Sequence, residues 1–209
     1  MSLMLDTELV PARDRGSRRL MVVLHGLGDS MDGYRWMPDA LGIPGLNYLL
    51  VNAPDPYFTG HSWYDFSGDP APGILRSRKL LFELLDAQRE KGFPTEQTTV
   101  FGFSQGCLMT WETGFRYPHR LAGLIGVSGY AHEPEKTLKD LSPVARQQRF
   151  LITHGVFDTL VPFAEAREQV NEIKADGLHV EWHEFAKAHT IAGEGELAVI
   201  RAFTMAGYK

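Results

Sequence analysis

Short apolar runs alternate with longer amphipathic stretches along this chain of 209 residues. The apolar runs are rich in β-branched and aromatic residues, and turn-forming residues bound them, which is typical of buried strands. Because several runs are continuously apolar, we expect both faces of the sheet to be covered. The predicted strands are Arg19–Leu24, Asn47–Val51, Thr98–Phe103, Leu121–Val127, Phe150–Thr153 and Leu178–Phe185, with Met4–Leu9 as an added edge strand.

The amphipathic stretches between the apolar runs predict helices. In one of them, Leu80, Leu81, Leu84 and Leu85 recur at the spacing that places them on one helical face. The predicted helices are Tyr34–Leu41, Gly73–Lys91, Gln105–Tyr117, Phe163–Asp176 and Glu194–Ala206. Strands that alternate with helices predict an α/β fold with a mostly parallel, doubly wound sheet and helices on both faces. No linker or repeat divides the chain, so we expect a single domain over residues 1–209.

The segment Pro54–Pro72 breaks this alternation, because it has no clear period and carries four prolines and two glycines. Long irregular loops often serve as lids or binding loops, so we predict a short lid-like loop that binds substrate. The alternative is that its rings anchor the loop to the core, and both can hold. The candidate substrate contacts are Tyr57, Phe58, His61 and Trp63.

The pentapeptide Gly102-Phe103-Ser104-Gln105-Gly106 joins a predicted strand to a predicted helix. A serine at such a sharp turn projects its hydroxyl above the sheet, and the flanking glycines avoid collisions with neighbouring backbone. The pattern is weak alone and gains weight from its position between strand and helix. We predict that Ser104 is a nucleophile.

A serine hydroxyl needs a histidine to take its proton and a carboxylate to orient that histidine. Asp158 follows the predicted strand that ends at Thr153, and His189 follows the one that ends at Phe185. Parallel sheets bind ligands beyond the carboxyl ends of their strands, so we expect these side chains to meet Ser104. The order Ser, Asp, His is that of the α/β-hydrolase topology. We predict His189 as general base and acid and Asp158 as orienting carboxylate.

A tetrahedral intermediate also needs two backbone N–H donors for its oxyanion. The residue after the nucleophile, Gln105, is expected to supply one. The loop His25-Gly26-Leu27-Gly28-Asp29 follows the first parallel strand, and we predict Leu27 as the second donor. The alternative for this loop is an ordinary glycine turn.

Composition and charge limit the classes of molecule that the protein is expected to bind. The net charge is -5 and no basic run stands out, which argues against nucleic acid and anionic membranes. No apolar run approaches the roughly 18 residues of a membrane span. The single cysteine, Cys107, cannot form an internal disulfide and fits a reducing compartment, so we expect a cytoplasmic protein. The sequence leaves a homodimer open.

Motifs for metal or cofactor chemistry are incomplete. Gly26 and Gly28 begin a dinucleotide pattern, but Met31 stands where its third glycine belongs. His179 and His183 lie on a predicted strand, where a separation of four residues is about 13 Å and too long to share a metal. We therefore predict no metal and no cofactor. Two alternatives to an esterase stay open: a non-catalytic ligand-binding protein on this fold and another acyl hydrolase such as a peptidase.

With these residues in place, the chain resembles the phospholipase/carboxylesterase branch of the α/β-hydrolases, which includes acyl-protein thioesterases and small bacterial carboxylesterases. The resemblance covers nearly the whole chain and implies cofactor-free hydrolysis of a carboxylic ester or thioester through a Ser104-acyl intermediate. It agrees with Leu27 and Gln105 as oxyanion donors. The matching segments are Leu24-His25-Gly26-Leu27-Gly28-Asp29, Ala53-Pro54, Ser62-Trp63-Tyr64-Asp65, Gly73-Ile74, Gly102-Phe103-Ser104-Gln105-Gly106, Ser128-Gly129-Tyr130, His154-Gly155, Asp158, Val161-Pro162 and His189.

Three positions depart from the family pattern. The family usually has a second glycine where Cys107 stands, and an acid or polar residue near Val156. It also has a glycine shortly before the histidine, where this chain has Ala186-Lys187-Ala188. The predicted triad is intact, and the sequence leaves open the physiological substrate, its acyl-chain length and the preference for ester or thioester.

Overall fold

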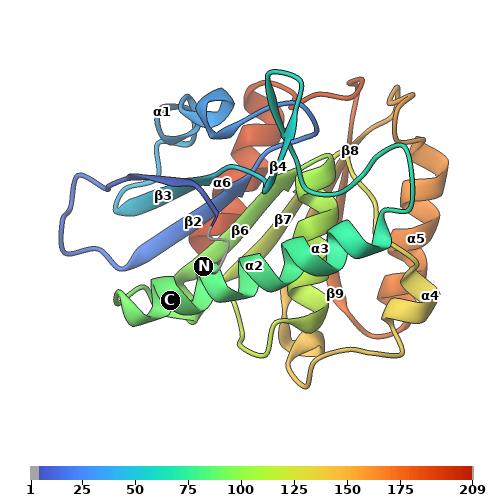
Figure 1. Cartoon of the computed structure of the whole chain (residues 1–209). Coiled ribbons are helices and arrows are strands. Elements are labelled where there is room, and N and C mark those ends of the chain that lie inside the picture. The colour runs from blue at the N-terminus through green and yellow to red at the C-terminus, as the bar shows by residue number, and fades with distance from the viewer. Residues whose placement is uncertain (1–4, 209) are drawn as a thin grey trace.

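The computed structural model describes residues 5–208 and contains a seven-stranded sheet in the order β1-β3-β2-β6-β7-β8-β9 (Figure 1). β1 pairs antiparallel with β3, and every other neighbouring pair in the sheet is parallel. The predicted mostly parallel sheet is thus confirmed. Its strands are β1 (Thr7–Val10), β2 (Arg19–Leu24), β3 (Leu46–Val51), β6 (Thr98–Phe103), β7 (Gly123–Val127), β8 (Arg149–Gly155) and β9 (His179–Phe185).

The strand boundaries differ from the prediction by a few residues. The edge strand begins at Thr7, and Met4 of its predicted range lies outside the described residues. β7 begins after Leu121, because the N–H of that residue bonds to the Gln148 side chain rather than to a strand. β8 runs on to Gly155, because β9 pairs with it to its end.

Helices cover both faces of the sheet, as predicted (Figure 1). One face packs against α2 (Ala71–Glu90), α3 (Gln105–Arg116) and α5 (Phe163–Ala175). The other packs against α1 (Met37–Leu41) and α6 (Glu194–Gly207). Apolar residues that alternate along each strand reach both layers, which explains why the strands read as continuous apolar runs.

Short elements escaped the sequence patterns, because three or four residues are too few to display a helical period. They are η1 (Met31–Tyr34), η2 (Thr95–Gln97), η3 (Ala145–Gln147) and α4 (Pro134–Thr137). The helix predicted from Tyr34 to Leu41 is divided: η1 ends at Tyr34, and α1 begins at Met37 with Pro38 in its first turn. Proline suits that position because its missing N–H would have no intrahelical acceptor.

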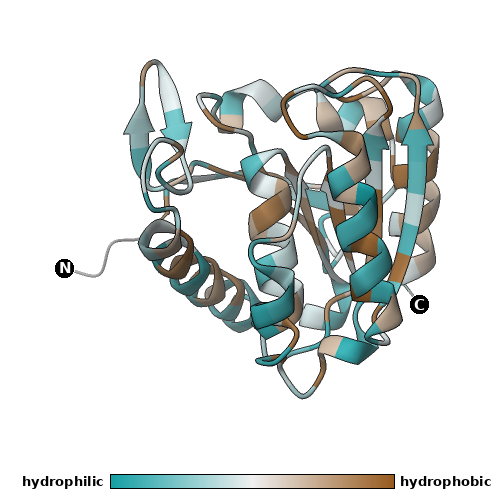
Figure 2. Ribbon diagram, turned by 90° about the vertical axis from the view of Figure 1, so that its right-hand side faces the viewer, coloured by the Kyte–Doolittle hydropathy of each residue, from teal (hydrophilic) through white to brown (hydrophobic). Residues whose placement is uncertain are grey.

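The segment predicted as an irregular loop, Pro54–Pro72, contains a β-hairpin. β4 (Asp55–Tyr57) pairs antiparallel with β5 (Gly60–Ser62), and the hairpin projects from the body of the protein (Figure 2). An ion pair between Asp55 and Arg76 of α2 ties the hairpin to the helix that follows. Strands of three residues carry too little alternation to be recognised from sequence.

The parallel strands β2, β6, β8 and β9 end at one edge of the sheet, and the loops that follow them meet there. This edge receives the segments predicted to carry the chemistry. None of the helices formed by residues 5–208 has the length and apolar character needed to cross a bilayer.

Candidate active site

Ser104 occupies the turn between β6 and α3 in a backbone conformation of φ 54° and ψ -114°, which residues with a side chain rarely adopt. The flanking glycines make this turn possible. A Cβ on Gly102 would lie 2.0 Å from the carbonyl oxygen of Gly106, and a Cβ on Gly106 would lie 2.3 Å from that of Leu24. The strained turn places Ser104 just before the first residue of α3, beyond the edge of the sheet.

Ser104, His189 and Asp158 form one hydrogen-bonded line. The distance from Ser104 Oγ to His189 Nε2 is 2.9 Å, and His189 Nδ1 lies 2.8 Å from Asp158 Oδ2. A carboxylate oxygen can only accept, so Nδ1 carries the proton and Nε2 is left to accept from the serine hydroxyl. The structure brings together the three residues that the sequence singled out, in an arrangement that can move a proton from serine to histidine.

The carboxylate of Asp158 is buried and fully engaged. Its Oδ1 accepts hydrogen bonds from the backbone N–H groups of Leu160, at 3.0 Å, and Val161, at 2.9 Å. Burial alone would raise the pKa of Asp158, but these N–H donors and His189 outweigh it and hold the pKa below its ordinary value. Asp158 is therefore ionised at neutral pH, as an orienting carboxylate must be.

A second histidine, His154 at the end of β8, lies near the same carboxylate. Its Nε2 is 2.9 Å from the Val161 carbonyl oxygen, to which it donates, and 3.6 Å from Asp158 Oδ2. Burial lowers the pKa of His154, and its ring stacks on Trp182 with centroids 5.8 Å apart. His154 is thus a neutral, packed histidine that stands outside the line from Ser104 to Asp158.

Two backbone amides near Ser104 are available to a ligand. Among residues 5–208, no hydrogen-bond acceptor meets the N–H of Leu27, whereas the neighbouring N–H of Gly28 bonds to the His61 carbonyl oxygen. Gln105 is the first residue of α3, and the first N–H groups of a helix have no intrahelical acceptor. These are the two amides that the sequence predicted as oxyanion donors.

The loop that carries Leu27 is fixed from inside by His25. His25 Nε2 accepts a 3.0 Å hydrogen bond from the N–H of Ala53, so its protonated Nδ1 donates to the Gly26 carbonyl oxygen at 2.6 Å. Burial lowers the pKa of His25, in keeping with a neutral ring that holds one proton. The histidine thereby locks the loop after β2 to the segment after β3.

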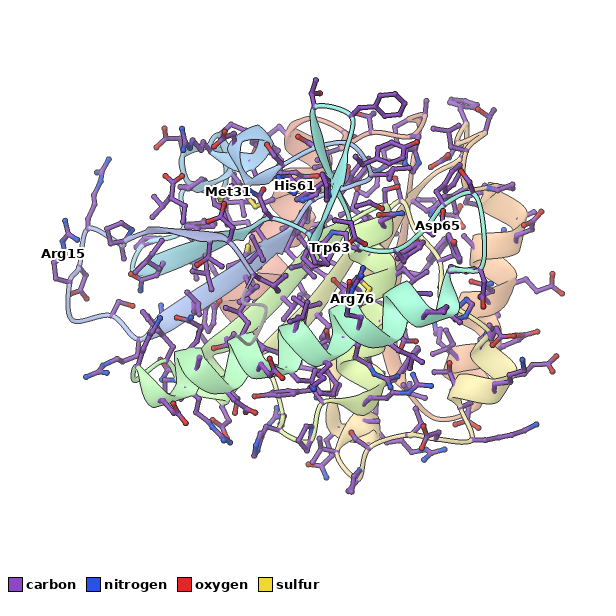
Figure 3. The ribbon with its side chains drawn as sticks, in the orientation of Figure 1. Arg15, Met31, His61, Trp63, Asp65 and Arg76 are labelled. Atoms are coloured by element: carbon purple, nitrogen blue, oxygen red, sulfur yellow. The ribbon has the colours of Figure 1, made fainter. Side chains whose placement is uncertain are left out.

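The hairpin and the residue that follows it hold the same loop from outside. His61 exchanges two backbone hydrogen bonds with it, each 2.9 Å long, and Trp63 Nε1–H donates to the His25 carbonyl oxygen at 2.9 Å. His61 lies in the second strand of the hairpin, and Trp63 follows that strand directly (Figure 3). The approach is so close that a Cβ on Gly60 would lie 2.3 Å from the Gly28 carbonyl oxygen.

The side chain of Gln105 extends this connection to the nucleophile turn. Its Oε1 accepts a 2.9 Å hydrogen bond from the N–H of Trp63, and its Nε2 donates to the Tyr64 carbonyl oxygen at 3.1 Å. Both candidate oxyanion segments are therefore bound to the same stretch of chain.

The four residues predicted as substrate contacts have different environments in the structure. Trp63 is completely buried, so we withdraw it from the substrate contacts, and its indole supports the loop after β2 instead. Tyr57 packs beside Gly28, and His61 is half-buried with its ring 6.1 Å from that of His25. Phe58 is 91% exposed at the hairpin tip. Trp63 therefore anchors the loop to the core, which is the alternative that the sequence left open.

Sequence reasoning missed a buried ion pair beside His189. Lys187 Nζ lies 2.6 Å from Glu196 Oε1, and both side chains are almost completely buried. Glu196 also accepts from Thr153 Oγ1 and from the N–H of Ala192. The loop that carries His189 is thus held on both sides of the histidine. The signal in the sequence was the segment Ala186-Lys187-Ala188, which stands where the family usually has a glycine shortly before the histidine.

Cys107, another of the three departures from the family pattern, is buried against Gly126 and Gly129. A Cβ on Gly129 would lie 2.4 Å from that of Cys107, so the glycine makes room for the cysteine. Burial raises the pKa of the Cys107 thiol to about 12, which leaves it protonated and packed. Within the described range 5–208, no cluster of three or more His, Cys, Asp or Glu side chains is arranged to hold a metal ion.

The fold is shared with solved structures. Esterase PE8 matches with a TM-score of 0.83 and 27% identity, over 97% of this chain and 98% of its own. SOBER1 of Arabidopsis thaliana matches with a TM-score of 0.84 and 22% identity, over 91% of this chain and 99% of its own. The predicted α/β-hydrolase fold is thereby confirmed.

The sequence itself has relatives along almost its full length. Acyl-protein thioesterase 1 of Schizosaccharomyces pombe is 31% identical over 198 residues, which cover 87% of this chain and 88% of that protein. The family model described as Phospholipase/Carboxylesterase matches residues 5–206. The chain therefore belongs to the phospholipase/carboxylesterase family of α/β-hydrolases.

Proposed function

We propose that this protein hydrolyses a carboxylic ester or thioester through an acyl intermediate on Ser104. Membership in its family makes it a hydrolase of the carboxylesterase or thioesterase type. The proposal concerns the residues that carry the reaction. The observation that supports it most strongly is the unbroken line of hydrogen bonds, 2.9 and 2.8 Å long, from Ser104 through His189 to Asp158.

In the first half of the reaction, His189 Nε2 takes the hydroxyl proton while Ser104 Oγ forms a bond to the substrate carbonyl carbon. The carbonyl oxygen becomes an oxyanion that accepts from the N–H groups of Leu27 and Gln105. Asp158 stabilises the imidazolium. The intermediate collapses as the bond to the leaving group breaks, and His189 returns the proton to the departing alcohol or thiol.

In the second half, water enters and His189 takes one of its protons as the water oxygen attacks the acyl carbon. The same two amides hold the second oxyanion. Its collapse breaks the bond to Ser104 Oγ, which recovers the proton from His189, and the carboxylic acid leaves. Every proton is returned, so the cycle needs no cofactor.

Ser104→Ala tests the proposal with a short p-nitrophenyl ester and a fluorophosphonate probe. We expect kcat to fall by about 10⁴-fold or more, and we expect the wild type alone to form an adduct on Ser104. Ser128→Ala is the matched control, because Ser128 is also a serine with positive φ just after a strand, and it is buried. Full turnover by the Ser104 variant would refute the proposal, and an unlabelled, folded wild type would favour a ligand-binding protein.

A further inference from the structure

A groove of about 450 Å³ opens beside His189 and is distinct from the hairpin side of the site. It lies between η1, the end of β6, the loop that carries His189 and the start of α6. The residues that line it and carry the argument are Asp29, Trp36, Phe103, Ile191 and Leu197, together with His189. Volumes of this size are typical of sites for small organic groups.

Aromatic and aliphatic side chains form the apolar part of the groove lining, beside the polar groups of Asp29, His189 and Thr190. Trp36 is 39% exposed and stacks on the buried ring of Tyr34, with centroids 6.4 Å apart. Phe103 lies under His189, with ring centroids 5.0 Å apart. An exposed indole beside a reactive histidine offers a flat apolar surface to a substrate.

The charged side chain that lines the groove is negative. Asp29 supplies a carboxylate, and no lysine or arginine is among the groove residues within the described part of the chain. Asp29 Oδ1 is held in place by the N–H of Ser30 at 2.7 Å. An anionic group placed in this groove would meet a negative charge and no counterion.

The proposed reaction decides which part of a substrate lies here. The oxyanion must face the amides of Leu27 and Gln105, whereas the leaving group must approach His189 Nε2 to receive its proton. The groove that His189 lines is thus next to the leaving group, and the acyl chain points away from it. We propose that this groove is the leaving-group subsite and that it favours an alcohol or thiol with an uncharged, apolar body over an anionic one. The inference rests on the proposed function.

Aryl acetates test the subsite because their acyl group is constant. The probes are phenyl acetate, 2-naphthyl acetate and the acetate of 6-hydroxynaphthalene-2-sulfonate, with each kcat/KM divided by the rate constant for alkaline hydrolysis. We expect the wild type to prefer 2-naphthyl acetate to phenyl acetate and to disfavour the sulfonate by about tenfold or more. Equal normalised values for all three esters would overturn the proposal.

Trp36→Ala should lower the ratio of 2-naphthyl to phenyl acetate by about tenfold, because the larger ring loses its apolar surface. Ile191→Ala provides a second, smaller truncation of the same groove. Met205→Ala is the matched control, since Met205 is 52% exposed on α6 and does not line the groove. Asp29→Asn should raise the ratio of the sulfonate to 2-naphthyl acetate several-fold at low ionic strength.

A second series separates the two ends of the substrate. With 2-naphthyl acetate, butyrate and hexanoate, the leaving group is constant, so Trp36→Ala should leave the acyl-length preference unchanged. A changed acyl preference with an unchanged naphthyl-to-phenyl ratio would assign the groove to the acyl chain and overturn the proposal. Failure of the proposed function would look different, because the Ser104→Ala variant would then hydrolyse these esters as fast as the wild type, or the wild type would hydrolyse none of them.

Discussion

Trp63 Nε1–H donates a 2.9 Å hydrogen bond to the carbonyl oxygen of His25, and so joins the segment after the hairpin to the loop after β2. That loop carries Leu27, whose N–H is one of the two proposed oxyanion donors. The bond is made by a completely buried indole, where a lost partner would leave a carbonyl oxygen unsatisfied. We infer that the hairpin segment positions the oxyanion loop in addition to bordering the site.

Trp63→Phe should lower kcat by about three- to tenfold and change KM little. The ring that fills the core is largely retained, but the hydrogen bond to His25 is lost, and oxyanion contacts act mainly in the transition state. Steady-state kinetics with a short ester measure the effect. Trp111→Phe removes the same volume from the same core without touching the loop, so an equal loss of kcat in both variants would contradict this role.

Gly60→Ala should damage catalysis more than stability. The new methyl would lie 2.3 Å from the Gly28 carbonyl oxygen and 2.5 Å from that of Asp29, so the hairpin and the oxyanion loop must move apart. We expect kcat to fall by about tenfold or more in a variant that still unfolds cooperatively. Gly195→Ala, whose methyl meets only a Phe185 ring atom at 3.9 Å, should keep full activity, and a Gly60 variant with wild-type kcat would exclude the contact as a constraint.

Much of the fold and the site could be predicted because each signal was local. The turn at Ser104 needs glycines on both sides, and the parallel strands carry Asp158 and His189 to one edge whatever their separation in sequence. The Ser, His and Asp side chains therefore meet as expected. Their catalytic roles stay a prediction until activity is measured.

The remainder depended on contacts between distant segments. Trp63 reads as an aromatic residue in a loop, and only the folded chain puts its indole against His25. Lys187 and Glu196 are ordinary charged residues in sequence, and their burial as a pair follows from the packing of α6 against β8. Neither the composition of the chain nor the spacing of its apolar residues indicates which distant residues will pair.

The acid sensitivity of stability should depend on Asp158. The pKa of Asp158 is lower in the folded protein than the value of about 3.9 expected unfolded, so its ionised form stabilises the fold at neutral pH. That contribution is lost as the pH falls below about 4 toward the folded pKa. Asp158→Asn should be less stable than the wild type at pH 7, and urea unfolding should find a smaller difference at pH 3. Asp39→Asn, at an exposed position, is the control, and a difference that grows in acid would contradict the prediction.

The buried ion pair of Lys187 and Glu196 should contribute to the stability of the fold. Lys187→Met leaves a buried carboxylate without its cation and should cost about 3–5 kcal/mol in the free energy of unfolding. Adding Glu196→Gln removes the orphan charge. Its amide oxygen can accept from the N–H of Ala192, and its NH2 group can donate to the Thr153 hydroxyl, so the double variant should recover most of the loss.

Urea denaturation of both variants measures this coupling, with Lys79→Met as the control. Lys79 pairs with Glu83 at 3.9 Å on the surface, where its removal should cost less than about 1 kcal/mol. A double variant as unstable as Lys187→Met would mean that packing of the lysine stem, rather than charge, holds the loop. Because the pair flanks His189, a fall in kcat that the double variant does not recover would further show that the ammonium positions the histidine loop.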